Sequence, residues 1–119
     1  MRVLLPLLRD DLDLEWADYD GDPAQLVPGL RGVLHPPGAS LGLEGIGLAA
    51  LVLAPALAVD AAGRRLGQGG GSYDRALART SAPVLAVVFD DEVLEAVPAQ
   101  GHDRPVGGTL TPSGGVRLF

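Results

Sequence analysis

The sequence predicts a three-layer α/β domain built around a mostly parallel central sheet. Two short aliphatic runs, at 51–59 and 84–89, have the length and composition of buried strands. The segment 73–79 between them can form a helix, and a strand, a helix and a strand in succession form a parallel pair with a right-handed crossover. At 119 residues the chain can bury one core, so a single domain over 1–119 is predicted.

A β-hairpin is predicted at the start of the chain. The apolar run 3–8 ends at three charged residues, which is typical of a central strand that reaches the sheet edge. Apolar and acidic residues then alternate at the start of 12–19, which predicts a half-exposed partner strand. Trp16 lies on the same predicted face as Leu12 and Leu14. Core packing is the favoured interpretation of Trp16, and an aromatic wall for a planar ligand is the alternative.

The remaining segments give weaker signals. Three glycines weaken any helix over 41–50, and a turn of helix is predicted over 92–97 before Pro98. The tail predicts a strand at 106–111, a turn, and a second strand or frayed end at 115–118.

The amino-acid composition limits which partners the protein can bind and which side-chain chemistry it can use. The net charge is −6, and all nine basic residues are arginines. Such a surface repels polyanions, so neither nucleic acid nor an anionic membrane is an expected partner. The chain has no cysteine, which excludes disulfides and thiolate chemistry within it and fits a cytoplasmic protein. The apolar N-terminal run is too short for a membrane span and is interpreted as a strand rather than a signal peptide.

The most informative stretch is 64–77, which reads RRLGQGGGSYDRAL and follows the most apolar run of the chain. A strand, a glycine-rich loop and a helix start together can bind phosphate through converging backbone N–H groups. Ser72 is a suitable helix N-cap, and Asp74 would lie in the first turn. A flexible surface loop is the alternative interpretation of the glycines. Arg64 and Arg75 fit ion pairs as well as phosphate contacts.

The sequence from Pro55 to Leu77 resembles the signature of the 5-formyltetrahydrofolate cyclo-ligase family, also called methenyltetrahydrofolate synthetases. His102-Asp103 before the strand at 106–111 resembles the family's C-terminal segment, so the similarity covers nearly the whole chain. The matching signature positions are Pro55, Ala56, Asp60, Gly63, Arg65, Leu66, Gly67, Gly69, Gly71, Tyr73, Asp74, Arg75 and Leu77.

This resemblance implies a fold, a reaction and a set of ligands. The fold would be the NagB/RpiA/CoA-transferase-like arrangement, with this chain forming its C-terminal two-thirds. The reaction would convert 5-formyltetrahydrofolate to 5,10-methenyltetrahydrofolate, with ATP converted to ADP and phosphate and with magnesium (Mg2+) required. A small-molecule folate and ATP are therefore the expected partners.

The resemblance also implies roles for individual residues. Arg65 would bind the phosphates, and Tyr73 would lie along the folate and nucleotide; these two are the candidate catalytic residues. Asp74 and Asp103 match the magnesium-ligand positions, although each by itself also fits a structural role at a helix start or a turn. The predicted nucleotide-binding residues are Arg65, Leu66, Gly67, Gln68, Gly69, Gly70, Gly71, Ser72 and Tyr73.

Two further functional classes stay open at this point. The first is a non-catalytic remnant of the family that binds nucleotide or folate without turnover. The second is a phosphate-binding α/β protein of other chemistry. Relative to the family, the chain begins at what would be the third strand, so an N-terminal ATP-contacting lysine has no counterpart. An N-terminally shortened sheet would have an uncovered flank, which predicts marginal stability or self-association.

Overall fold

The computed structural model describes residues 1–67, 70–98 and 104–119. Its helical elements are the α-helix α1 (Ser72–Leu77) and the 3-10 turns η1 (Pro23–Gln25), η2 (Leu30–Gly32), η3 (Leu43–Leu48) and η4 (Asp90–Glu92). Its strands are β1 (Val3–Leu8), β2 (Leu14–Tyr19), β3 (Val27–Pro28), β4 (Leu34–His35), β5 (Val52–Pro55), β6 (Ala58–Asp60), β7 (Arg65–Leu66), β8 (Val84–Val87), β9 (Val93–Leu94), β10 (Gly108–Thr111) and β11 (Gly115–Leu118). The protein is therefore a mixed α/β chain of short elements.

The largest sheet has the strand order β11-β10-β8-β5. Strands β5, β8 and β10 run parallel, and β11 returns antiparallel to β10. The predicted parallel pair is confirmed, because β5 and β8 pair directly and α1 lies between them in the sequence. The predicted C-terminal strand, turn and strand are confirmed as the β10–β11 hairpin.

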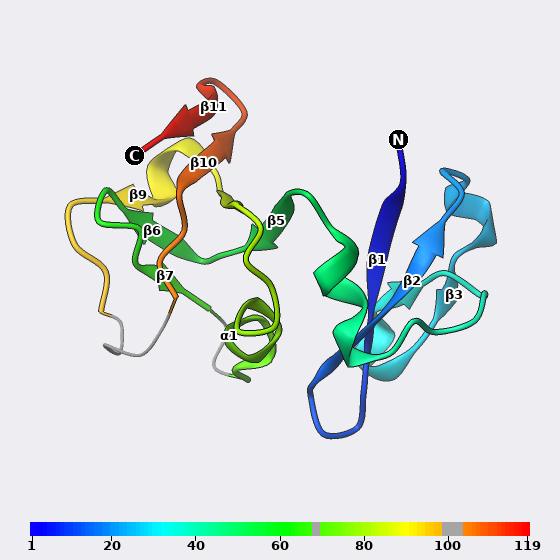
Figure 1. Cartoon of the computed structure of the whole chain (residues 1–119). Helices are drawn as coiled ribbons and strands as arrows, with labels where there is room; N and C mark the ends of the chain where they lie inside the picture. The colour runs from blue at the N-terminus through cyan, green and yellow to red at the C-terminus, as the bar shows by residue number, and fades with distance from the viewer. Residues whose placement is uncertain (68–69, 99–103) are drawn as a thin grey trace.

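The predicted N-terminal hairpin is also confirmed, but the prediction that its first strand is central is wrong. β1 and β2 form an antiparallel sheet of their own, with Leu8 opposite Leu14. Pro6 lies within β1 and carries no N–H for a second ladder, which suits a strand that pairs along one edge. In Figure 1 this hairpin lies on the right and the strands β5 to β11 on the left, with η3 between them and α1 below β5.

The apolar run at 51–59 does not form the single buried strand that its composition predicts. It forms β5 and β6, which belong to different sheets. Side chains alternate along β5, with Val52 buried and Leu53 half exposed, so only one face of this strand is covered. The ladder leaves β5 at Pro55, and β6 pairs instead with β7 and β9.

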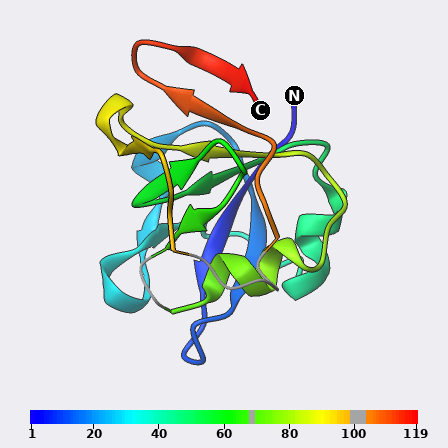
Figure 2. The same cartoon turned by 90° about the vertical axis from the view of Figure 1, so that its left-hand side faces the viewer.

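The hydrophobic core lies between the inner face of the large sheet, α1, η3 and the β1–β2 hairpin. Leu77 of α1 and Ile46 of η3 are each 1% exposed. Trp16 is buried in this core, as the favoured interpretation predicts. Figure 2 shows this arrangement from the left-hand side of Figure 1, with α1 below the strands of the large sheet. The inner sheet face contributes Val52, Ala54, Val84 and Ala86 to the core.

The predicted turn of helix at 92–97 is wrong. The chain makes the single 3-10 turn η4 and then continues as β9, which pairs in parallel with β6. The Glu92 carboxylate accepts a hydrogen bond from the Phe89 N–H at 2.7 Å, and the helical conformation ends after this single turn. Pairing of Val93 with Val59 then replaces the local helical preference.

The second face of the large sheet is apolar and partly exposed, although Leu85 of β8 on the same face is buried. The strand register places Leu53, Val87, Val116 and Leu118 on this face, which we call the outer sheet face. Their exposed fractions are 50%, 41%, 59% and 77%. In the described part of the chain no helix is long and apolar enough to cross a membrane.

Candidate functional site

Arg65 lies at the centre of the candidate site. It begins β7, and its side chain is 5% exposed. One terminal nitrogen donates to the Pro55 carbonyl oxygen at 3.0 Å, at the end of β5. The other donates to Asp74 Oδ1 at 2.9 Å. Arg65 therefore links the end of the parallel strand β5 to the first turn of α1.

Tyr73 lies between Arg65 and the core tryptophan. Its ring meets Trp16 edge to face, with centroids 6.4 Å apart, and the Arg65 guanidinium carbon lies 6.0 Å from the ring centroid. Burial raises the pKa of the Tyr73 hydroxyl, although the charge of Arg65 opposes this shift. The phenol is therefore neutral at physiological pH and can donate a hydrogen bond.

Two buried donors in this cluster have no hydrogen-bond partner among the residues that the structure describes. They are Arg65 Nε and Trp16 Nε1. Both flank Tyr73, so the arrangement combines a buried positive charge with unused donor capacity. Such groups can bind an anionic or carbonyl oxygen.

The glycine loop is described at Gly67, Gly70 and Gly71, whereas Gln68 and Gly69 lie outside the described residues. Gly71 has φ +71°, and a Cβ there would lie 2.8 Å from Arg75 Nη1. A Cβ on Gly67 would lie 3.2 Å from Arg65 Nη1. Leu66 is 37% exposed beside this loop. A side chain at position 67 or 71 would therefore crowd an arginine of the site.

Helix α1 begins one residue earlier than its predicted cap implies. Gly71 is the N-cap, so the prediction that Ser72 caps the helix is wrong. The Ser72 hydroxyl instead donates to the Leu12 carbonyl oxygen in the β1–β2 turn. Asp74 lies in the first turn as predicted, and its side chain is 42% exposed.

The predicted metal site is described only in part. Asp103 lies outside the described residues, as does His102. Within the ranges 1–67, 70–98 and 104–119, no three His, Asp or Glu side chains gather into a metal site. One oxygen of Asp74 accepts from Arg65, and the exposure of the side chain leaves the carboxylate accessible to a cation.

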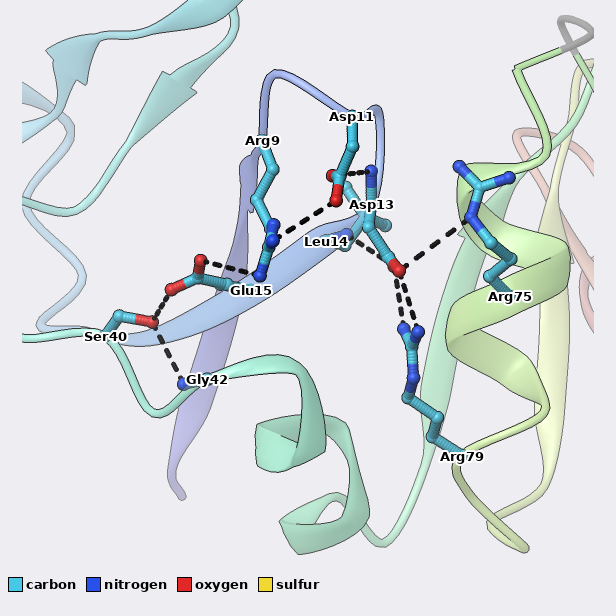
Figure 3. Close-up of polar contacts among 9 residues, drawn as sticks. All are labelled: Arg9, Asp11, Asp13, Leu14, Glu15, Ser40, Gly42, Arg75 and Arg79. Atoms are coloured by element: carbon cyan, nitrogen blue, oxygen red, sulfur yellow. Dashed lines mark hydrogen bonds and ion pairs between the residues drawn. The ribbon is translucent and has the colours of Figure 1, made fainter.

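A polar cluster around Asp13 has no counterpart among the predicted site residues (Figure 3). Both Asp13 oxygens accept from Arg79, each at 2.7 Å, and Arg75 Nε lies 3.8 Å from Oδ2. The bonds from Arg79, with the Leu14 N–H, lower the pKa of Asp13 to about 2 even though burial opposes the charge. The available signal in the sequence was the spacing of Arg75 and Arg79, which places both on one side of a helix.

Asp60 has a structural role beside the site. Its side chain is fully buried and accepts from the N–H groups of Val97, at 2.9 Å, and Ala62, at 3.0 Å. The Arg64 guanidinium pairs with it at 2.8 Å. Burial opposes the charged form of Asp60, but the hydrogen bonds from the Val97 N–H and from Arg64 outweigh it and lower its pKa. Arg64 is thus an ion-pair residue, and Arg75 contacts the Asp13 cluster.

Comparison with known proteins identifies the family. The model of the 5-formyltetrahydrofolate cyclo-ligase family matches residues 1–112. A 5-formyltetrahydrofolate cyclo-ligase from Mycolicibacterium smegmatis is 47% identical to this chain, over 97% of its length. This chain spans 62% of the length of that relative.

Solved structures agree with this match. A 5,10-methenyltetrahydrofolate synthetase from Aquifex aeolicus superimposes with a TM-score of 0.76 at 29% identity, over 98% of this chain and 58% of its own. A 5,10-methenyltetrahydrofolate synthetase from Mycoplasma pneumoniae shares the fold, with a TM-score of 0.66 at 16% identity, over 92% of this chain and 55% of its own.

The resemblance carried by the glycine-rich stretch is therefore confirmed, and the fold is the mixed α/β fold of the solved relatives. With a family model matched over residues 1–112 and a relative at 47% identity, the chain belongs to the 5-formyltetrahydrofolate cyclo-ligase family.

Proposed function

We propose that this chain takes part in the ATP-dependent conversion of 5-formyltetrahydrofolate to 5,10-methenyltetrahydrofolate, with release of ADP and phosphate. The formyl oxygen would accept the γ-phosphoryl group of ATP, and ADP would leave. The N10 amine of the folate would then attack the formyl carbon, lose its proton, and expel phosphate together with the former formyl oxygen.

The observation that carries the proposal is the convergence of Arg65, Tyr73 and Asp74. They come from a strand and from a helix start on either side of the glycine loop. Arg65 contacts Asp74 at 2.9 Å and lies 6.0 Å from the Tyr73 ring. A phosphoryl transfer depends on positioning and on charge stabilisation more than on covalent participation of the protein. A guanidinium, a phenol and a carboxylate in one cluster are suited to that task.

The donor set fits ATP and magnesium. Arg65 Nε is a buried donor with no partner in the described part of the chain, so it has capacity for a phosphate or carbonyl oxygen. The Asp74 carboxylate is an oxygen ligand of the kind that magnesium prefers, and Asp103 is the second proposed ligand. Bound magnesium would neutralise phosphate charge during transfer.

This chain's own residues would divide the remaining work. Backbone N–H groups of the segment 66–72 would bind phosphate oxygens, because glycines there allow close approach. Arg65 would hold negative charge, and Tyr73 would orient the folate or nucleotide through its neutral hydroxyl. The core beneath Tyr73 would keep water from that side of the site.

One observation favours the alternative of binding without turnover. The Arg65 side chain is 5% exposed and already bonded to Asp74 and to Pro55. Phosphate binding by Arg65 would thus require it to share or exchange a partner. A family member of this kind would bind nucleotide or folate and release no methenyl product.

The outer sheet face bears on the proposed domain arrangement and on self-association. We propose that residues 1–119 form one domain, which makes up the C-terminal two-thirds of the three-layer NagB/RpiA-like arrangement of the family, and that the complete arrangement would cover this face. An exposed face of Leu53, Val87, Val116 and Leu118 supports self-association of the chain through it. The acidic net charge supports the absence of a nucleic-acid or membrane partner, and the lack of cysteine supports a cytoplasmic location.

Titration calorimetry with ATP and magnesium, followed by an absorbance assay for methenyltetrahydrofolate, tests the proposal. Turnover that is lost in Arg65→Lys and kept in the control Arg117→Lys is the expected result. Arg117 is an exposed arginine on β11, so the control makes the same change away from the site. Binding without product would establish the alternative, and a chain that binds no nucleotide would contradict both.

A further inference from the structure

We propose that Asp13 is a positioning residue, which holds α1 in the orientation that brings Tyr73 and Asp74 to Arg65. The proposal builds on the proposed function, because the residues that it positions are those of the proposed site. Asp13 itself lies in the turn between β1 and β2, and its side chain is 11% exposed.

Helix α1 needs tertiary contacts to fix its orientation. It has six residues, far below the length at which an isolated helix is stable in water. Only Ala76 and Leu77 of the helix are buried in the core. These two side chains hold the C-terminal end. In the first turn Tyr73 packs against the core but is only partly buried, so polar bonds also help to fix the orientation of that turn.

The β1–β2 turn supplies bonds along the length of the helix. At the first residue, the Ser72 hydroxyl donates to the Leu12 carbonyl oxygen. One turn later, Arg75 Nη2 donates to the same oxygen at 3.0 Å. Beyond the C-cap, Arg79 donates a hydrogen bond to each carboxylate oxygen of Asp13 (Figure 3). Leu12 and Asp13 thus bind the beginning, the middle and the end of this segment.

The turn itself is held in an unusual backbone conformation. Leu12 has φ +67°, a left-handed conformation that a leucine rarely adopts. Its carbonyl accepts two bonds from α1, and the neighbouring Asp13 is bonded at both oxygens and also accepts from the Leu14 N–H at 2.9 Å. Such a conformation persists where the surroundings fix it, so turn and helix stabilise each other.

The bonds between the β1–β2 turn and α1 also determine where two residues of the proposed site lie. Tyr73 and Asp74 lie between Ser72 and Arg75, the two residues whose side chains bond Leu12. A shift of α1 would therefore move both of them relative to Arg65, which is anchored independently to the Pro55 carbonyl. A displacement of about 1 Å in a reacting geometry can lower a rate roughly 100-fold.

The experiment compares three single substitutions in the full chain at a temperature where every variant is folded. Asp13→Asn keeps the shape of the side chain and removes its charge. Asp18→Asn makes the same change on the same hairpin, in an exposed pair with Arg2. Val106→Ala truncates a buried core residue and controls for general destabilisation. The readouts are kcat, KM for ATP, and the emission of Trp16, the only tryptophan.

For Asp13→Asn we expect kcat to fall roughly 10- to 100-fold, with a shift of Trp16 emission as Tyr73 moves. Asp18→Asn and Val106→Ala should keep both values. Adding Arg79→Gln to Asp13→Asn should cause little further loss, because the two side chains act as one unit. Unchanged kcat and emission in Asp13→Asn would overturn the proposal. If the wild type has no turnover, the proposed function fails, and Trp16 emission alone decides the positioning role.

Discussion

At the scale of single residues, the site depends on arginines that pair with carboxylates. Arg65 pairs with Asp74 and Arg79 pairs with Asp13, and both pairs join separate elements. Arg64 pairs with Asp60 within the turn between β6 and β7. A guanidinium can make two parallel bonds to a carboxylate, as Arg79 does, which fixes orientation as well as distance. In a chain without lysine, these pairs supply rigidity that point charges would not.

The Asp13 pair predicts a pH dependence of stability. Its folded-state pKa is about 2 and its ordinary value is 3.8, so its charge stabilises the fold above pH 3.8 and this contribution is lost as the pH falls toward 2. The contribution is on the order of 1–2 kcal/mol after allowance for solvent screening. Urea unfolding of the wild type and Asp13→Asn should differ by this amount near neutrality and by about half of it near pH 3. A difference independent of pH would contradict this cause.

At the scale of elements, α1 is short and is tied at both ends to distant segments through side-chain hydrogen bonds. Ser72 and Arg75 bind the β1–β2 turn, whereas Arg104, just before β10, bonds the region that follows the helix. The Arg104 guanidinium donates to the carbonyl oxygens of Leu77, at 3.0 Å, and Thr80, at 2.6 Å, and also to Ala82. These are carbonyls that the end of the helix and its exit loop leave without helical partners.

Replacement of Arg104 should therefore loosen the exit from α1. In Arg104→Lys the single ammonium cannot reproduce a fork that contacts three carbonyls. We expect a loss of about 1–3 kcal/mol in the free energy of unfolding, measured by chemical denaturation. The control Arg117→Lys, on the exposed strand β11, should change it by less than about 0.5 kcal/mol. Equal losses in the two variants would show that the carbonyl contacts contribute nothing specific.

At the scale of the whole molecule, one face of the large sheet is covered and the other, apart from Leu85, is partly exposed. Val52, Ala54, Val84 and Ala86 pack in the core, while the residues of the outer sheet face are 41–77% exposed. Burial of apolar area contributes about 25 cal/mol per Å², so covering this face by association of two chains would be favourable.

The exposed face predicts self-association that depends on concentration. Sedimentation equilibrium of the wild type should give a weight-average mass that rises with protein concentration. The double variant Val87→Lys/Leu118→Lys should shift this equilibrium toward the monomer, because it places charges on the outer sheet face. Leu34→Lys, at a half-exposed leucine on β4, is the matched control and should associate like the wild type. A wild type that stays monomeric at every concentration would refute the prediction.

Local patterns in the sequence determined the elements whose causes are local. The β1–β2 and β10–β11 hairpins, the parallel β5–β8 pair and the helix after the glycine loop all follow from hydrophobic runs and turn residues within a few positions. The glycine-rich signature likewise indicates the family from the sequence alone, because its residues are contiguous in the chain.

Only the tertiary structure decided how distant segments meet. The division of 51–59 into β5 and β6 depends on which neighbours pair with each half. Asp13 and Arg79 are 66 positions apart, and Arg65 reaches its partners only after β5, β7 and α1 have assembled. Composition indicates which secondary structure a segment prefers, whereas burial and ion pairing depend on how distant segments pack. The glycine-rich stretch thus identified the family from sequence, but the fold alone placed Arg65, Tyr73 and Asp74 in one cluster.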